Sequence, residues 1–200
     1  ALENTKASFP RQVLPVVNGA PIAGGRKMLS RDPNKPERVV AEIACADVDT
    51  VEKAVAAAKT AFVDWSVTPA EKRVDCLFKA AQRVRAKRHD LAALLVYEAG
   101  KNWNEAQADI CEAVDFLEFY GREMIRLNQP RVASELPGES SRLGFIPRGV
   151  GAVIAPWNFS LPISIGMTAA ALVSWLPSAG SWSAPTTSHS ASVGRRPPAQ

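Results

Sequence analysis

The sequence is short of the features that mark membrane, secreted and metal-binding chains. It has three cysteines, two histidines and no apolar run of the roughly 18 to 20 residues that a membrane span requires. The first ten residues show neither the basic nor the apolar region of a signal peptide. Cys45, Cys76 and Cys111 are odd in number and lack metal-ligand spacing. We therefore expect a soluble, cytoplasmic chain with no membrane partner, no bound metal and no disulfide framework.

A strong excess of one charge is also missing. The chain carries 24 Lys and Arg against 20 Asp and Glu, a net charge of +4, and the basic residues are spread along it. This balance argues against a nucleic-acid partner. With 46% hydrophobic residues in 200, the composition is sufficient for one domain with a core.

The composition changes abruptly near the end. Residues 174–200 hold seven Ser, four Pro and two Arg but no Asp, Glu, Lys, Ile or Phe. They show neither a helical nor a strand period and too few aliphatic residues to offset the entropy of ordering. We expect this Ser/Pro-rich tail to be disordered.

The first half of the chain reads as a hairpin, a strand and three helices. Val13 to Ile22 predicts the hairpin, with Asn18-Gly19 in its turn; a Pro/Asn turn over 31–36 precedes a strand over 39–44. Asp47 then caps a helix whose buried face we expect to hold Val48, Val51, Val55, Ala58 and Phe62. A capping box over 68–71 opens a second helix, with apolar positions Val74, Leu77, Phe78, Ala81 and Val84. Residues 91–98 predict a third helix, which Gly100 ends.

A long helix and a change to strands follow. Apolar residues at spacings of three and four predict a helix from Trp103 to Leu127, with an apolar face of Trp103, Ala106, Ile110, Val114, Leu117, Tyr120 and Met124. Residues 143–146 and 150–155 read as short strands, the second buried on both faces. Pro156 to Phe159 makes a tight turn into the apolar segment 161–173. Helices followed by a buried strand, a turn and a further apolar segment indicate an α/β fold.

Asn158 lies in this turn, where open α/β sheets bind ligands. Its amide could donate a hydrogen bond to an oxyanion. Alternatively, Asn158 only caps the following helix, because Asn is a favoured N-cap residue. Periodicity leaves both interpretations open.

Four segments resemble a known family. Residues 144–159, GFIPRGVGAVIAPWNF, are similar to the P-x-G-V-x-x-x-I-x-P-W-N-F-P signature of the NAD(P)-dependent aldehyde dehydrogenases. YEAGKNW over 97–103, DICEAVDFLEFY over 109–120 and Pro137-Gly138-Glu139 resemble the branch that oxidises L-glutamate γ-semialdehyde, the 1-pyrroline-5-carboxylate dehydrogenases. The resemblance covers about residues 13–173.

The resemblance implies the N-terminal part of the aldehyde dehydrogenase fold: an incomplete Rossmann-like NAD-binding domain over 1–173, with helices and a β-hairpin arm, and an oligomerisation strand at about 140–148 that makes a homo-oligomer. In that family the aldehyde is oxidised through a cysteine thiohemiacetal and the hydride passes to NAD. Asn158 would be the oxyanion donor and Phe159 would line the aldehyde tunnel. The residues along the cofactor would be Ile154, Ala155, Pro156 and Trp157.

Glu112 resembles the acidic residue that faces the substrate's amino group in the semialdehyde branch. A carboxylate beside a cationic group is chemically reasonable. Glu105, Asp109 and Glu112 nevertheless recur at spacings of four and three, so they could also form a solvated helix face.

The chain departs from the family in two places. Ser160 stands where the family usually has Pro, which restores a backbone N–H and leaves Asn158 in place. After residue 173 the family continues with G-N-x-V-V-x-K-P, whereas this chain reads SWLP, and the family's nucleophilic Cys and general-base Glu would lie beyond Gln200. We hypothesise a reading-frame shift at about codon 174; a divergent, truncated protein is the alternative.

We therefore expect an enzyme by family that oxidises L-glutamate γ-semialdehyde to L-glutamate with NAD in proline catabolism, and a 200-residue chain that is inactive alone. The alternatives are an aldehyde dehydrogenase of another substrate branch and a non-catalytic fragment. We expect the three cysteines to be packing residues, because free Cys is usually buried. His89, at a helix start, and His189, in the tail, receive no role.

Overall fold

The computed structural model describes residues 1–174, and the predicted disorder of the tail falls almost entirely on residues outside that range. The helices are α1 (Leu2–Lys6), α2 (Val48–Val67), α3 (Ala70–Ala86), α4 (Arg88–Ala99), α5 (Trp103–Leu127) and α6 (Ser160–Val173). The strands are β1 (Arg11–Val13), β2 (Val16–Val17), β3 (Ala20–Pro21), β4 (Lys27–Asp32), β5 (Lys35–Ala44), β6 (Arg131–Leu136) and β7 (Glu139–Leu143). None of the described helices is both long and apolar enough to cross a membrane.

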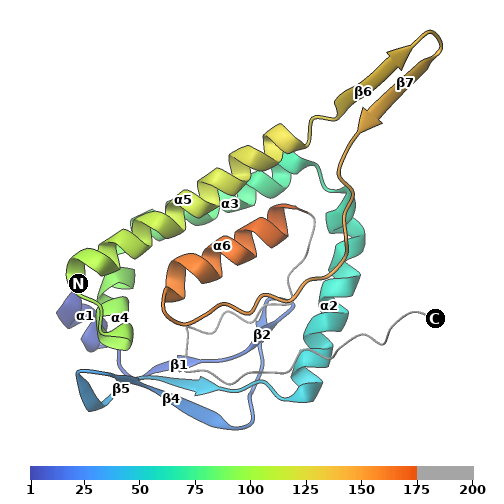
Figure 1. The fold of residues 1–200 in the computed structure, drawn as a ribbon. Helices are drawn as coiled ribbons and strands as arrows, with labels where there is room; N and C mark the ends of the chain where they lie inside the picture. Colours follow the sequence, from blue (N-terminus) through green and yellow to red (C-terminus); the bar gives the residue numbers. More distant parts are fainter. Residues whose placement is uncertain (175–200) are drawn as a thin grey trace, which may run out of the picture.

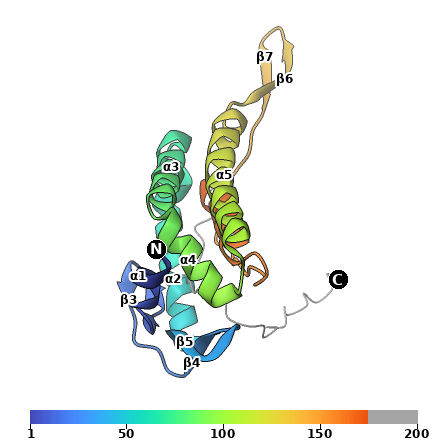
Figure 2. The same cartoon turned by 90° about the vertical axis from the view of Figure 1, so that its left-hand side faces the viewer.

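The core lies between four helices. α5 packs along α3 and α6 and also contacts α4, and the packed arrangement of α3 and α5 is visible from two sides (Figures 1 and 2). The small side chains of Ala81, Ala92, Ala106 and Ala113 are fully buried there, so the helix axes can approach closely. The predicted apolar faces of α3 and α5 are confirmed, with Val74, Leu77, Ile110, Val114 and Leu117 all in this core.

A three-stranded sheet lies against α4. Its order is β1-β5-β4, with β1 parallel and β4 antiparallel to the central β5. The sheet is attached to α4 by a hydrogen bond of 2.9 Å from Ser30 Oγ to a Glu98 carboxylate oxygen. An edge-to-face contact of Phe9, just before β1, with Tyr97 of α4 adds to this attachment. The predicted strand 39–44 is confirmed as the end of the longer β5, whereas the sequence interpretation missed β4 and placed its last residues in a turn.

Two hairpins complete the fold. The predicted turn of the first is confirmed, because Asn18 and Gly19 both have positive φ between β2 and β3. The second hairpin, β6–β7, projects away from the helices (Figure 2) and exposes all six residues of β6. The prediction of a strand over 143–146 is wrong in its bounds: β7 ends at Leu143, and Phe145 and Ile146 lie exposed beyond it.

Two predictions about helix packing and capping are wrong. On α2, Val48 and Val51 are 73% and 52% exposed, because this helix packs on little of the described structure, and only Ala58 of the predicted face is buried. Asp47 does cap α2, accepting a hydrogen bond from the Thr50 N–H at 2.8 Å. Thr68 does not cap α3: its hydroxyl donates back to the Asp64 carbonyl at the end of α2, and Pro69 occupies the N-cap position.

The predicted buried strand over 150–155 is also wrong. This segment is extended, and its exposure alternates, with Val153 and Ala155 half-buried and Ala152 and Ile154 exposed, but only Gly151 makes a bridge. A strand buried on both faces requires neighbours on both edges. The described residues provide no sheet around this segment, so it runs as a single extended chain beneath α6 (Figure 1).

Candidate functional site

The candidate site centres on the turn between this extended segment and α6. The N-cap of α6 is Phe159, without a side-chain hydrogen bond, so the interpretation of Asn158 as a helix cap is wrong. Asn158 is exposed, and its amide makes no hydrogen bond to any described residue. The Phe159 carbonyl accepts the first helical hydrogen bond, from the Ile163 N–H at 3.2 Å. Asn158 therefore presents an exposed amide one residue before Phe159, the N-cap of α6.

The far end of α6 is fixed by two side chains. The Trp65 indole N–H donates to the Leu172 carbonyl at 2.9 Å, and Arg73 Nε donates to the Val173 carbonyl at 3.0 Å. Arg73 is fully buried, and burial lowers the pKa of its guanidinium. A cation at this position also complements the negative end of the helix dipole. The α6 helix that begins beside Asn158 is thus held at its C-terminus by α2 and α3.

A buried ion pair lies against Phe159, the N-cap residue of α6. Lys101 Nζ is 2.5 Å from Asp109 Oδ2, and the two side chains are 14% and 5% exposed. The same Nζ lies 4.5 Å from the centroid of the Phe159 ring. Lys101 itself is fixed between Gly100, the left-handed C-cap of α4, and Asn102, whose side chain caps α5.

The sequence interpretation missed this pair. It grouped Asp109 with Glu105 and Glu112 as a possible solvated face, and that face does not exist as a unit, because Asp109 is buried while the two glutamates are exposed. A usable signal was present: Asp109 is flanked at i−3 and i+4 by Ala106 and Ala113, which are both fully buried. A carboxylate inside an apolar stripe requires a partner.

Glu112 is an exposed residue of α5. It follows Asp109 by three residues and precedes Phe116 by four, so the three positions are neighbours along one side of the helix. The Phe116 ring lies against Gly166 of α6, and Asp109 pairs with Lys101, which contacts the Phe159 ring. Glu112 therefore follows and precedes residues that connect α5 to α6 and to the turn.

The four residues predicted along the cofactor form a mostly exposed apolar strip. Ile154 and Trp157 are 73% and 65% exposed, Pro156 is exposed and Ala155 is half-buried. Together with Phe159, which is 44% exposed, they lead directly to Asn158. Large apolar side chains that line one exposed stretch are typical of a surface that another group covers.

The prediction that all cysteines are packing residues is wrong. Cys76 and Cys111 are exposed and Cys45 is half-buried, and all three are free. The two exposed cysteines lie beside the apolar stripes of α3 and α5, on positions that point outward rather than between the helices. None of the three belongs to the turn that carries Asn158.

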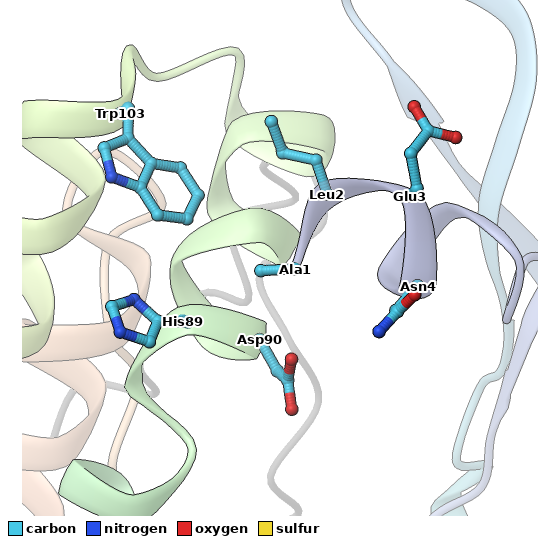
Figure 3. A pocket seen from close by; sticks show the side chains of 7 residues that line it. All are labelled: Ala1, Leu2, Glu3, Asn4, His89, Asp90 and Trp103. Atoms are coloured by element: carbon cyan, nitrogen blue, oxygen red, sulfur yellow. The ribbon is translucent and has the colours of Figure 1, made fainter.

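A second surface feature lies elsewhere. Figure 3 shows an open pocket where α1 meets the beginnings of α4 and α5, lined by Ala1, Leu2, Glu3, Asn4, His89, Asp90 and Trp103. The His89 and Trp103 rings stack at 6.3 Å, and all seven lining residues are exposed. The pocket includes none of the predicted site residues. Within residues 1–174, no group of three or more His, Cys, Asp or Glu is placed to hold a metal ion.

Comparison with known proteins identifies the family and the relatives of this chain. The sequence model of the aldehyde dehydrogenase family matches residues 21–174. The 1-pyrroline-5-carboxylate dehydrogenase of Geobacillus thermodenitrificans is 43% identical over 173 residues, which are 86% of this chain and 34% of that protein. The chain therefore spans about a third of the length of the curated relatives it matches.

Solved structures show the same similarity. The 1-pyrroline-5-carboxylate dehydrogenase from Thermus with bound NAD is 38% identical, with a TM-score of 0.83, and the match covers 88% of this chain and 34% of that one. Proline utilization A from Bdellovibrio bacteriovorus is 39% identical, with a TM-score of 0.87, over 88% of this chain and 18% of that one. The expected α/β fold class is confirmed by these neighbours.

Proposed function

Because this chain belongs to the aldehyde dehydrogenase family, we propose that residues 1–173 are the N-terminal part of an enzyme that oxidises L-glutamate γ-semialdehyde to L-glutamate with NAD. The observation that carries the proposal is the exposed, unpartnered amide of Asn158 at the end of an apolar strip. The similarity to 1-pyrroline-5-carboxylate dehydrogenases supports the substrate branch. The end of the family match at residue 174 supports the boundary of this part.

The proposed role of Asn158 is to donate its amide N–H to the oxygen of the reacting aldehyde. When a nucleophile adds to an aldehyde, the carbonyl oxygen gains negative charge, and a preorganised donor stabilises that charge. The Asn158 side chain has no competing hydrogen bond among the described residues, so nothing has to be broken before it donates. Removing such a donor costs roughly 3 to 4 kcal/mol of transition-state stabilisation in comparable sites.

NAD fits the exposed strip. Ile154, Pro156 and Trp157 present exposed apolar surface that a flat ring of the cofactor would cover, and Ala155 between them is half-buried. NAD, when bound, supplies the hydride acceptor for aldehyde oxidation. The described residues would hold it by apolar contact and keep water away from the aldehyde carbon.

Phe159 and Glu112 would contact the substrate. The Phe159 ring, 44% exposed, would line the path of the aldehyde, and the Glu112 carboxylate would pair with the substrate's amino group. The exposure of both side chains and the position of Glu112 between Asp109 and Phe116 on α5 support this division of roles.

We also propose a cytoplasmic homo-oligomer. The free cysteines support a reducing compartment. The projecting β6–β7 hairpin, with Val132, Leu136 and Leu143 more than half exposed, supports pairing with another subunit around residues 140–148.

A hybrid enzyme tests the function. Residues 1–173 of this chain are joined to the C-terminal part of the Geobacillus thermodenitrificans relative, beginning after the segment that aligns with residue 173. We expect NAD reduction with glutamate γ-semialdehyde, and a kcat/KM for it well above that for acetaldehyde or benzaldehyde. The 200-residue chain alone, assayed in parallel, should show no turnover. A folded hybrid that prefers the simple aldehydes would contradict the substrate branch.

A further inference from the structure

We propose that the buried Lys101–Asp109 pair positions the oxyanion donor, with Phe159 as the link. The inference rests on the proposed role of Asn158 but concerns two residues that have no part in the chemistry described above. Both are positioning residues, because neither is in the turn that meets the aldehyde. The proposal follows from two contacts and one covalent connection, which link α5 to the turn: Asp109 with Lys101, Lys101 with Phe159, and Phe159 with Asn158.

The first contact fixes the ammonium group. Gly100 ends α4 in the left-handed conformation, and Asn102 Oδ1 accepts the Glu105 N–H at 3.0 Å, so the backbone of Lys101 is held between two caps. The side chain then reaches Asp109, two turns along α5, at 2.5 Å. With 14% and 5% of the side chains exposed, water competes little for either charge.

The second contact joins the ammonium group of Lys101 to the Phe159 ring in the turn. A cation over an aromatic face is attracted by the ring quadrupole, and the attraction is strongest where water is excluded. Lys101 Nζ lies 4.5 Å from the Phe159 centroid, within the range of such contacts. Phe159 is the N-cap residue of α6, so this ring contact connects the ammonium group directly to the start of the helix.

The third step is covalent. Asn158 precedes Phe159 in the chain, is exposed, and has no hydrogen bond of its own among residues 1–174. The direction of its amide therefore depends on the backbone of the turn, and the turn depends on the ring of Phe159. An oxyanion donor must be held close to its productive geometry before the reaction. Loosening Phe159 should therefore lower turnover more than substrate binding.

Hydrogen–deuterium exchange on the 200-residue chain tests the mechanical part. Lys101→Met and, as a second variant, Asp109→Asn should each raise the exchange rate of amides 163–166, the first hydrogen-bonded amides of α6, by roughly tenfold, the scale of one desolvated cation–ring contact. Lys101→Arg, which retains a cation that can pair with a carboxylate and lie over a ring, should stay within about threefold of the parent. The control is Lys79→Met, which breaks the exposed pair with Asp75 on α3 and should leave amides 163–166 unchanged.

Two results would overturn this part. Unchanged exchange over 163–166 in both Lys101→Met and Asp109→Asn would show that the pair does not hold the turn. An equal rise over the whole of α3 and α5 would show a general loss of stability instead.

Turnover of the hybrid enzyme tests the catalytic consequence. Lys101→Met should lower kcat roughly tenfold with KM within about twofold, and Lys101→Arg should restore most of it. A rise in KM with unchanged kcat would contradict positioning. If Asn158→Ala leaves turnover unchanged while the exchange results hold, the proposed function fails and the mechanical link stands, so the two failures are distinguishable.

Discussion

Replacing Gly166 by Val should separate α6 from α5. A Cβ at Gly166 would lie 3.0, 3.1 and 3.3 Å from three ring atoms of Phe116. All three distances are below the roughly 3.5 to 4.0 Å at which carbon atoms attract. The Phe116 ring stacks on Tyr120 with an interplanar angle of 7°, so it cannot turn aside freely. The helices must therefore move apart or the ring must leave its rotamer.

The expected cost follows from two opposing effects. Replacing Gly inside a helix gains roughly 0.5 kcal/mol or more in helix propensity, depending on the new residue. Overpacking a buried contact costs about 1 to 3 kcal/mol, and Val brings two further methyl groups to a position where the first already collides. We therefore expect Gly166→Val to lower the free energy of unfolding by about 1 to 2 kcal/mol, whereas Gly166→Ala should be nearly neutral.

Urea unfolding followed by far-ultraviolet circular dichroism measures this difference. The control is Met167→Val, one residue along the same helix and 41% exposed, which should cost only about 0.5 kcal/mol of helix propensity. A Gly166→Val variant as stable as the Met167→Val control would refute the close approach of α5 and α6.

Two further predictions concern buried charge. Burial raises the pKa of Glu98, so the folded chain binds its proton more tightly than the unfolded chain, and this group costs stability as pH rises above the ordinary carboxyl range. Glu98→Gln should therefore gain stability relative to the parent between pH 4 and pH 7 in urea titrations, and a constant difference across that range would contradict the burial effect. Arg73→Met leaves the carbonyls of Thr68 and Val173 without their donor and should cost about 2 to 4 kcal/mol in the same assay; a cost below about 0.5 kcal/mol would show that Arg73 does not hold α6.

The helical layer could be predicted because its signals are local. The spacing of Val74, Leu77 and Ala81 on α3 and of Ile110, Val114 and Leu117 on α5 identifies faces that the structure buries. The same reasoning failed on α2, where Val48 and Val51 repeat at helical spacing but remain exposed. Periodicity shows that a face is apolar, whereas the partner that covers it is a tertiary property.

At the turn that carries Asn158, local sequence signals again succeeded where tertiary properties could not be predicted. Its sequence is specific enough to identify the family, yet the strand expected before it is an extended segment with a single bridge, at Gly151, because sheet formation depends on neighbours distant in sequence. The Lys101–Asp109 pair was missed because Asp109 was grouped with Glu105 and Glu112 on the basis of their spacing alone. The alanines that flank Asp109 indicate its burial, but they do not identify the partner of its carboxylate, because Lys101 lies outside α5.

The most direct test of the account is the kcat of the hybrid enzyme with Asn158→Ala. If Asn158 donates to the oxyanion, kcat for glutamate γ-semialdehyde should fall by roughly 10² to 10³ while the hybrid stays folded and retains its affinity for NAD. A kcat within about twofold of the parent hybrid would show that the exposed amide of Asn158 plays no part in the reaction.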